Sequence, residues 1–211
     1  MSEQKRDIGR VQLHSLDDLG IYIHKMRNWK ALLRSAGVLA GAEIGAALGA
    51  ITIHSKLYVK HYDAKREKSY DYGLVGARKI TQAGVVYLVA AWQAANSTLG
   101  NFKYHGCGTG TNSESNADTA LQTECTTVLN PDSTRATGSQ TVQSGGVVNN
   151  ILQSVGTLTF DGSATVTEHG LLSQAATGGG TLWDRTVFTG ISVVTVDTMT
   201  FTYQCTVSYE A

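Results

Sequence analysis

The 211-residue sequence predicts a mainly β (α+β) fold: an antiparallel β-sandwich or jelly-roll-like domain with one packed helix, preceded by a helical N-terminal region. Two observations predict this class. The chain after residue 101 is rich in Thr, Val and Gly, poor in charge, and breaks into six segments that alternate apolar and polar residues. Clusters such as "TGTNSES", "SGG" and "TGGG" separate these segments, as expected for turns between antiparallel strands.

The first expected element is an amphipathic helix that begins after Ser15 and ends near Gly37. One apolar stripe recurs along it at helical spacing: Leu16, Leu19, Ile23, Met26 and Leu33. Basic residues occupy the other faces and form a candidate docking surface: Lys25, Arg27, Lys30 and Arg34. We therefore divide the chain into a basic helical region, 1–49, that docks or anchors, and a β-domain, 50–211.

Residues 36–53 are mostly Gly and Ala, with glycines at four-residue spacing. Such spacing occurs in transmembrane helices, but Glu43 near the centre disfavours a membrane span. In water, each of these glycines would weaken a helix by about 1 kcal/mol relative to alanine. We therefore expect a Gly-rich connection that enters a strand near Ala50.

That strand is expected at 51–63, where Ile51, Ile53, Leu57 and Val59 share one face. The charged turn "DAKREKS" leads to a partner strand at "YDYGLV". His54 and His61 are an odd number of residues apart, so they point to opposite faces and cannot share a metal ion. We expect two surface histidines.

A second helix is expected at about 81–95, opened by Thr81. Its predicted buried face is formed by Val85, Leu88, Val89 and Trp92. The six β segments follow: "FKYHGCG", "RATGSQTVQ", "NILQSVGTLTF", "ATVTEHGLLSQ", "TLWDRTVF" and "DTMTFTYQCTVSY". The last alternates most cleanly, with one apolar face made of Met199, Phe201, Tyr203, Cys205 and Val207.

The stretch "NFKYHGCGTGT" is the strongest candidate for chemistry. Its glycines follow neither the dinucleotide-binding nor the P-loop pattern, and no helix pattern follows them. His105 and Cys107 would lie about 6–7 Å apart on one strand face, too far for a direct hydrogen bond. We interpret the glycines as a tight turn with positive φ at the end of a strand. We predict no catalytic residue and no cofactor.

A metal site is not expected either, because the candidate ligands follow no known spacing: His105, Glu114, Asp118, Glu124, Glu168 and His169. The odd number of cysteines argues against a secreted disulfide framework, and "MSEQKRDIGR" does not resemble a signal peptide. One hypothesis remains for the thiols, that they form disulfides between neighbouring subunits: Cys107, Cys125 and Cys205. We expect an exposed loop around Cys125.

The charge is divided unevenly along the chain. Residues 1–79 carry fourteen Lys or Arg against eight Asp or Glu, whereas residues 80–211 carry three against nine. The first part therefore suits an acidic docking partner, and the second excludes electrostatic binding of nucleic acid. We predict neither nucleic acid nor a membrane as a partner.

Several segments resemble a widespread group of tailed-bacteriophage virion structural proteins. The most specific are "KYHGCGTGT", "DTALQTE", "TEHGLL" and "LWDRTVF", and the resemblance extends over about residues 51–209. It implies a structural role on the virion, after synthesis in the bacterial cytoplasm, and it transfers no catalytic residue. The first 50 residues lie outside it.

The resemblance, together with the low charge of the β-domain, leads us to expect a capsid decoration or cement protein. Such a protein binds the outside of the shell and stabilises it. Its expected partners are the major capsid protein, other virion proteins and further copies of itself, with a trimer as one arrangement. The alternatives are a tail, neck or fibre component, a module that binds a receptor or glycan, and an enzyme.

Overall fold

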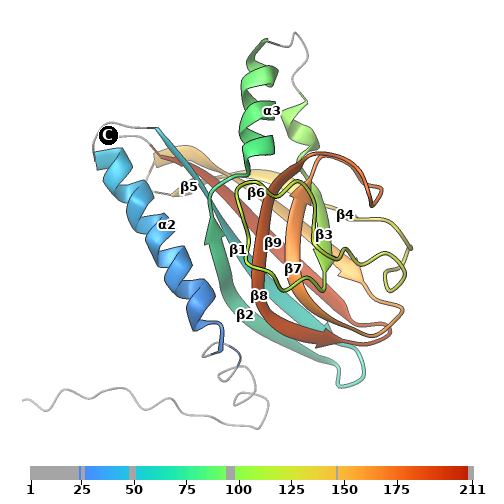
Figure 1. Ribbon diagram of the computed structural model, residues 1–211. Helices are drawn as coiled ribbons and strands as arrows, with labels where there is room; N and C mark the ends of the chain where they lie inside the picture. Colours follow the sequence, from blue (N-terminus) through green and yellow to red (C-terminus); the bar gives the residue numbers. More distant parts are fainter. Residues whose placement is uncertain (1–23, 25–26, 48–50, 94–97, 146, 209–211) are drawn as a thin grey trace, which may run out of the picture.

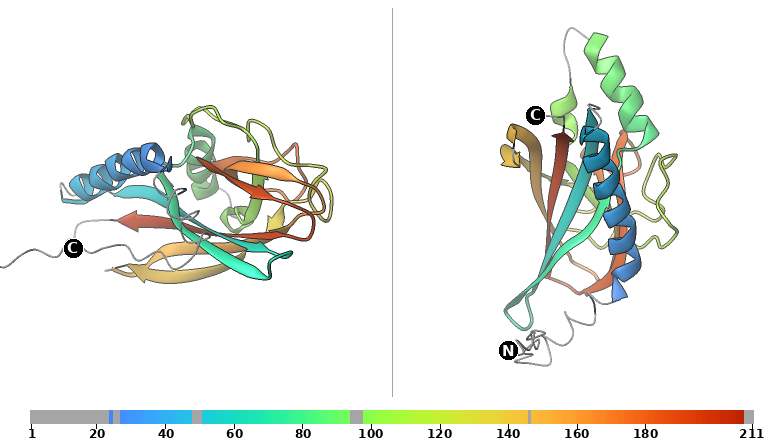
Figure 2. Two further views of the ribbon diagram at one scale, coloured as in Figure 1. Left: turned by 90° about the horizontal axis from the view of Figure 1, so that it is seen from below. Right: turned by 90° about the vertical axis from the view of Figure 1, so that its left-hand side faces the viewer.

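Two antiparallel sheets pack face to face in the computed structural model, which describes residues 24, 27–47, 51–93, 98–145 and 147–208 (Figure 1). One helix lies along the outside of the larger sheet, and another projects beyond the end of the sandwich (Figure 2). The expected class, a mainly β sandwich with a packed helix, is confirmed.

The larger sheet has five strands in the order β2-β1-β9-β6-β5, and the smaller has four in the order β4-β3-β7-β8. The larger sheet consists of β1 (Thr52–Asp63), β2 (Lys68–Arg78), β5 (Ser139–Gly145), β6 (Val147–Thr159) and β9 (Thr198–Ser208). The smaller consists of β3 (Tyr104–Gly108), β4 (Ala136–Thr137), β7 (Ala164–Leu172) and β8 (Leu182–Val193). The pairing within both sheets is antiparallel.

The core lies between the sheets and follows the period-two alternation of the strands. On β9, Met199, Phe201 and Tyr203 are almost completely buried, while the threonines between them are partly exposed. The alternation predicted for this strand is therefore confirmed over most of its length. Thr206 and Val207 are the exceptions: Thr206 is buried, and Val207 is exposed at the open end of the sandwich, where it lines a pocket.

The segment predicted as one strand at 135–143 is divided between the two sheets at Gly138. β4 pairs with β3 in the smaller sheet, and β5 pairs with β6 in the larger. A side chain at Gly138 would meet Ser154 and would approach His105 Nε2 to 2.7 Å. The chain can therefore pass from one sheet to the other only because this position has no Cβ.

The expected Gly-rich connection at 36–53 is wrong, and so is the helix end at Gly37. Helix α2 runs without interruption over Trp29–Ala47. It is held on β2 by tertiary bonds: the Ser35 hydroxyl accepts the Ala77 N–H at 2.7 Å, and Asn28 Nδ2 donates to the Val75 carbonyl at 3.1 Å. Packing thus overrides the low helix propensity of glycine.

The N-terminal stripe is only partly within the described structure. Leu16, Leu19, Ile23 and Met26 lie outside the described residues. Leu33 is described, and it is exposed on α2, away from the face that packs on β2. The described part of the N-terminal region therefore packs against the sandwich through Asn28, Ser35 and Ala42.

Helix α3 (Gln82–Gln93) is present where it was predicted. The Thr81 hydroxyl accepts the N–H of Gly84 at 3.0 Å and caps its first turn. A short 3-10 turn, η1 (Leu99–Asn101), precedes β3. Within the described residues, no helix combines the length and the apolar character that crossing a membrane requires.

The two histidines of β1 are buried, so the expectation that they lie on the surface is wrong. His61 contacts Asp197, with 3.0 Å between His61 Nε2 and Asp197 Oδ2. Asp197 also accepts backbone N–H groups from Ala64 and Val194, so it ties the β8–β9 turn to the end of β1.

Candidate functional site: the apolar surface around helix α3

The glycine-rich stretch at the end of β3, together with the loop that follows it, binds a carboxylate of the same chain, that of Glu168. The Glu168 carboxylate is fully buried and accepts backbone N–H groups from Gly110 at 3.1 Å, Gln122 at 3.0 Å and Thr123 at 2.8 Å. Arg185 Nε donates to the same carboxylate at 2.7 Å. Hydrogen bonds and an opposite charge together compensate the burial of this carboxylate.

The glycines are needed for this close approach. A Cβ at Gly110 would lie 2.5 Å from Glu168 Oε1, and one at Gly108 would collide with both Glu168 and the Thr123 carbonyl. Neither glycine has a positive φ. The predicted positive-φ turn is therefore wrong: these residues lack side chains because a buried carboxylate occupies the space.

Arg185 extends this ion pair into the loop that follows β3. Its guanidinium contacts Asp118 at 3.0 Å and the Asn112 side-chain oxygen at 2.6 Å. Desolvation lowers its pKa, but hydrogen bonds to Glu168 and Asp118 outweigh this effect, so the pKa of Arg185 is raised. The loop is thus fastened to β7 and β8 by charge-assisted bonds.

His105, which was considered beside Cys107, and His169, which was considered as a metal ligand, both face the interior. His105 and His169 are buried, with 3.0 Å between His105 Nδ1 and His169 Nε2, and His105 Nε2 lies 2.9 Å from the Ser154 hydroxyl. Burial lowers the pKa of His105 to about 3 and that of His169 well below its ordinary value. Neutral, buried rings of this kind support the core and do not meet a substrate from solvent.

All three cysteines carry free thiols and are buried, at 0% exposure for Cys107 and 6% each for Cys125 and Cys205. Cys125 is thus buried itself, although the loop around it is exposed at Gln122, Thr123 and Thr127, as expected. Burial raises the pKa of Cys205 to about 12, which disfavours its reactive thiolate. Disulfides between subunits would require each thiol to leave the core first.

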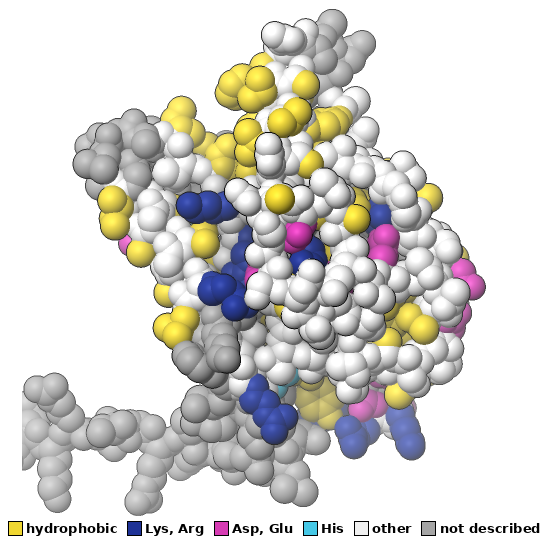
Figure 3. Space-filling model, in the orientation of Figure 1, with side chains coloured by type: hydrophobic (Ala, Val, Ile, Leu, Met, Phe, Trp, Pro, Cys, Tyr) yellow, Lys and Arg dark blue, Asp and Glu magenta, His cyan; other side chains and the backbone are white. Residues whose placement is uncertain are grey.

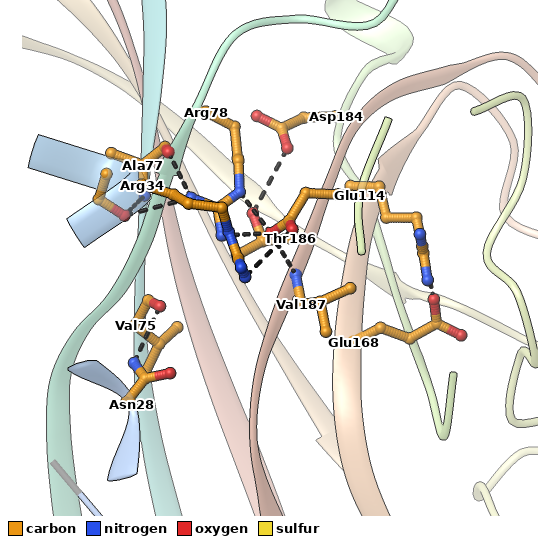
Figure 4. Close-up of polar contacts among 12 residues, drawn as sticks. Asn28, Arg34, Val75, Ala77, Arg78, Glu114, Glu168, Asp184, Thr186 and Val187 are labelled. Atoms are coloured by element: carbon orange, nitrogen blue, oxygen red, sulfur yellow. Dashed lines mark hydrogen bonds and ion pairs between the residues drawn. The ribbon is translucent and has the colours of Figure 1, made fainter. Parts of the chain in front are cut away.

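The predicted basic docking surface is only partly described. Arg27 and Arg34 are exposed on the N-terminal region, but Arg34 lies 3.4 Å from Glu114. Glu114 also binds Arg78 of β2 at 2.5 Å and the Val187 N–H of β8 at 3.2 Å (Figure 4). Arg34 therefore helps to hold α2 on the sandwich. Lys25 and the side chain of Lys30 lie outside the described part.

Helix α3 exposes most of the face that was predicted to be buried. Trp92 is 75% exposed and Val86 62%, and Val85 and Val89 are also exposed. Yellow side chains gather on this helix in the space-filling view (Figure 3). We call this set, Val85, Val86, Val89 and Trp92, the α3 surface. No charged residue occurs between Gln82 and Gln93.

Two pockets flank the α3 surface. One has a volume of about 480 Å³ and lies between α3 and the loop residues Ala117, Thr119 and Thr181. The other has about 300 Å³ and lies at the open end of the sandwich, with a mostly apolar lining from α3, the 3-10 turn and both sheets. Projecting side chains and hollows thus occur together on one apolar part of the molecule.

Sequence reasoning missed this exposure because α3 is apolar on all sides. A helix with a polar stripe reveals which side meets solvent, whereas a helix without one is expected to be covered. The absence of charged residues along α3 was the available signal that set it apart from an ordinary surface helix. Exposed apolar patches of this kind mark sites of interaction with other molecules.

Within the described residues, no three His, Cys, Asp or Glu side chains are grouped so that they could hold a metal ion. Comparisons with protein-family models, with curated proteins and with solved structures found no match. The function must therefore be argued from the sequence and from the geometry of the chain.

A Glu168→Gln variant tests the buried ion pair. The amide would present an N–H group to backbone donors and would leave Arg185 without its closest counter-charge, so we expect a loss of about 3 kcal/mol in the free energy of unfolding. Urea denaturation of the variant and the wild type measures this difference in unfolding free energy. The control is Lys60→Gln, which removes an ion pair that is exposed on both sides and should change stability by less than about 1 kcal/mol. Equal effects of the two variants would contradict this account.

The histidine pair predicts a pH dependence of stability. Because the pKa of His105 in the folded protein, about 3, is below its ordinary value of 6.5, stability is full above pH 6.5 and is lost as the pH falls from 6.5 towards 3. Asp184 acts in the opposite direction, since burial raises its pKa to about 6. Asp184 is present both in the wild type and in a variant that lacks His105, so its contribution to the pH dependence cancels when the two proteins are compared.

We therefore compare the wild-type chain with His105→Gln. Between pH 7 and pH 5, the wild type should lose about 2 kcal/mol more unfolding free energy than the variant, because only the wild type must protonate this histidine on unfolding. Urea titrations at the two pH values measure the difference. Parallel pH profiles would show that His105 is not held neutral by the fold.

Proposed function

We propose that the chain is a virion structural protein of a tailed bacteriophage, and more narrowly a capsid decoration protein that binds the outside of the shell and stabilises it. The phage assignment is supported by the segments that resemble this group, including "KYHGCGTGT" and "LWDRTVF". The role in assembly is supported by one structural observation, the uncovered and uncharged α3 surface.

The occupant that we propose for the α3 surface is a second copy of this chain. A surface that contacts its own copy must offer both the projections and the hollows into which they fit. Trp92 and Val86 project from α3, and the two pockets lie on either side of the same helix. The absence of charge between Gln82 and Gln93 also avoids like-charge repulsion between identical faces.

Contact with the shell is assigned to the basic N-terminal region. Residues 1–79, which comprise this region and strands β1 and β2, carry the excess of Lys and Arg, and this excess suits an acidic surface. Residues 1–49 alone carry seven Lys or Arg against five Asp or Glu. Arg27 is exposed, and the Arg34 side chain is 47% exposed although it is paired with Glu114. The major capsid protein is the proposed partner for this region. The α3 surface then joins neighbouring copies on the shell.

The copy number per particle tests the proposal. Particles of the phage that encodes the chain are purified, and the chain is quantified against the major capsid protein by mass spectrometry with labelled peptide standards. A decoration protein should be present at an abundance similar to that of the shell protein.

A count roughly tenfold or more below the shell protein would instead favour the alternative, a neck, tail or fibre component. Absence of the chain from purified particles would overturn the virion assignment altogether. An extract of infected cells, analysed in parallel, serves as the control that the chain was produced.

A further inference from the structure

We infer that Cys107 and Cys125 form a site of reversible oxidation, a disulfide within one chain that joins β3 to the loop lying beside it. This inference concerns the sandwich alone and does not depend on the proposed virion role. It replaces the hypothesis of disulfides between subunits with one that the described geometry favours.

The two cysteines face each other across an antiparallel pairing. The Cys125 N–H donates to the Cys107 carbonyl at 2.9 Å, and the Thr109 N–H donates to the Thr123 carbonyl at 2.9 Å. Gly108 and Glu124 form the bridge between these two hydrogen-bonded positions. Cys107 is therefore directly opposite Cys125, and directly opposite residues place their side chains on the same face.

The Cα spacing of this arrangement is compatible with a disulfide, which forms once the two side chains move together. Opposite residues at a hydrogen-bonded position have Cα atoms about 5.5 Å apart, which is within the range of about 4.4–6.8 Å that disulfides require. Both thiols also belong to the same buried cluster between the sheets. Cys205, in contrast, is on β9 of the larger sheet and has no cysteine opposite it: its neighbours across the pairing are Ser55 and Leu152.

The chemical roles of the two thiols differ. A hydrogen bond between the two side chains is the largest cause of both shifts: it raises the pKa of Cys107 and lowers that of Cys125. Glu124 and Glu168 lie near both thiols and oppose the thiolate form. Cys125 also lies beside the exposed residues Gln122 and Thr123, whereas Cys107 is fully buried. Cys125 is therefore the attacking thiol, and Cys107 is the resolving one.

The oxidant is a low-molecular-weight disulfide such as oxidised glutathione. The Cys125 thiolate attacks one sulfur of glutathione disulfide, a mixed disulfide forms, and one glutathione thiolate leaves and takes up a proton. The Cys107 thiol then loses its proton and attacks the Cys125 sulfur, and the second glutathione leaves. Two protein thiols are oxidised to one disulfide, and one glutathione disulfide is reduced to two glutathione molecules.

Access to the site requires a local opening in which the segment around Cys125 releases its bonds to β3 and to Glu168. Within the described residues, this segment is joined to β3 by an isolated bridge and not by a continuous strand, and Gln122 and Thr123 beside it are exposed. Once formed, the disulfide closes the loop between residues 107 and 125, which carries the three backbone N–H groups that bind Glu168.

The experiment uses the full-length chain, reduced and then incubated with millimolar oxidised glutathione at pH 8. Intact mass and peptide mapping without reductant should show the loss of two hydrogens, a linked Cys107–Cys125 peptide pair and one remaining free thiol. The thermal midpoint should rise by about 6–12 °C, since a crosslink of this loop length restricts the unfolded chain. Added reductant should reverse both changes.

Two variants identify which cysteines form the disulfide. Cys205→Ser should still form the disulfide, because it retains the opposed pair. Cys107→Ser should stop at the mixed disulfide and gain one glutathionyl group on Cys125. A wild-type chain that keeps three free thiols, links Cys205, or forms disulfide-bonded dimers in place of the internal bond would overturn the inference.

Discussion

The burial of the Glu168 carboxylate is the constraint on which the rest of the smaller sheet depends. An ionised carboxylate inside a protein is tolerated only when hydrogen bonds and an opposite charge replace its hydration. Arg185 supplies the charge from β8, and the backbone of the loop after β3 supplies three N–H groups. Gly108 and Gly110 provide the space. One side chain thereby fixes β3, β7, β8 and the loop relative to one another.

This internal framework extends to the end of the sandwich where α3 lies. The loop held by Glu168 and Arg185 forms one wall of the larger pocket, where Ala117 and Thr119 face α3. In the contact that we propose between two copies, a wall held in place by these bonds would reduce the loss of conformational entropy on association. The buried network and the proposed contact surface would then be parts of one arrangement.

The sequence predicted those features that depend on local pattern. The alternation in β9 and the helix that begins at Thr81 are properties of neighbouring residues, and both were predicted. The role of Gly110, which makes room for the Glu168 carboxylate, was not predicted, because Glu168 is 58 residues away along the chain. The continuation of α2 through Gly37 also depends on distant contacts, with β2. The exposure of α3 could not be predicted because an apolar helix without a polar face does not indicate which side will be covered.

Sedimentation velocity of the purified full-length chain over a concentration series, with and without Trp92→Lys, tests the central claim most directly. Trp92 is 75% exposed, so its replacement should leave the fold intact. The account predicts that the wild type self-associates and that Trp92→Lys weakens association by about 30-fold or more. The control Leu33→Lys, at a position on α2 that is 60% exposed, should not weaken it. A wild-type chain that stays monomeric at all concentrations, or equal association of the three chains, would contradict it.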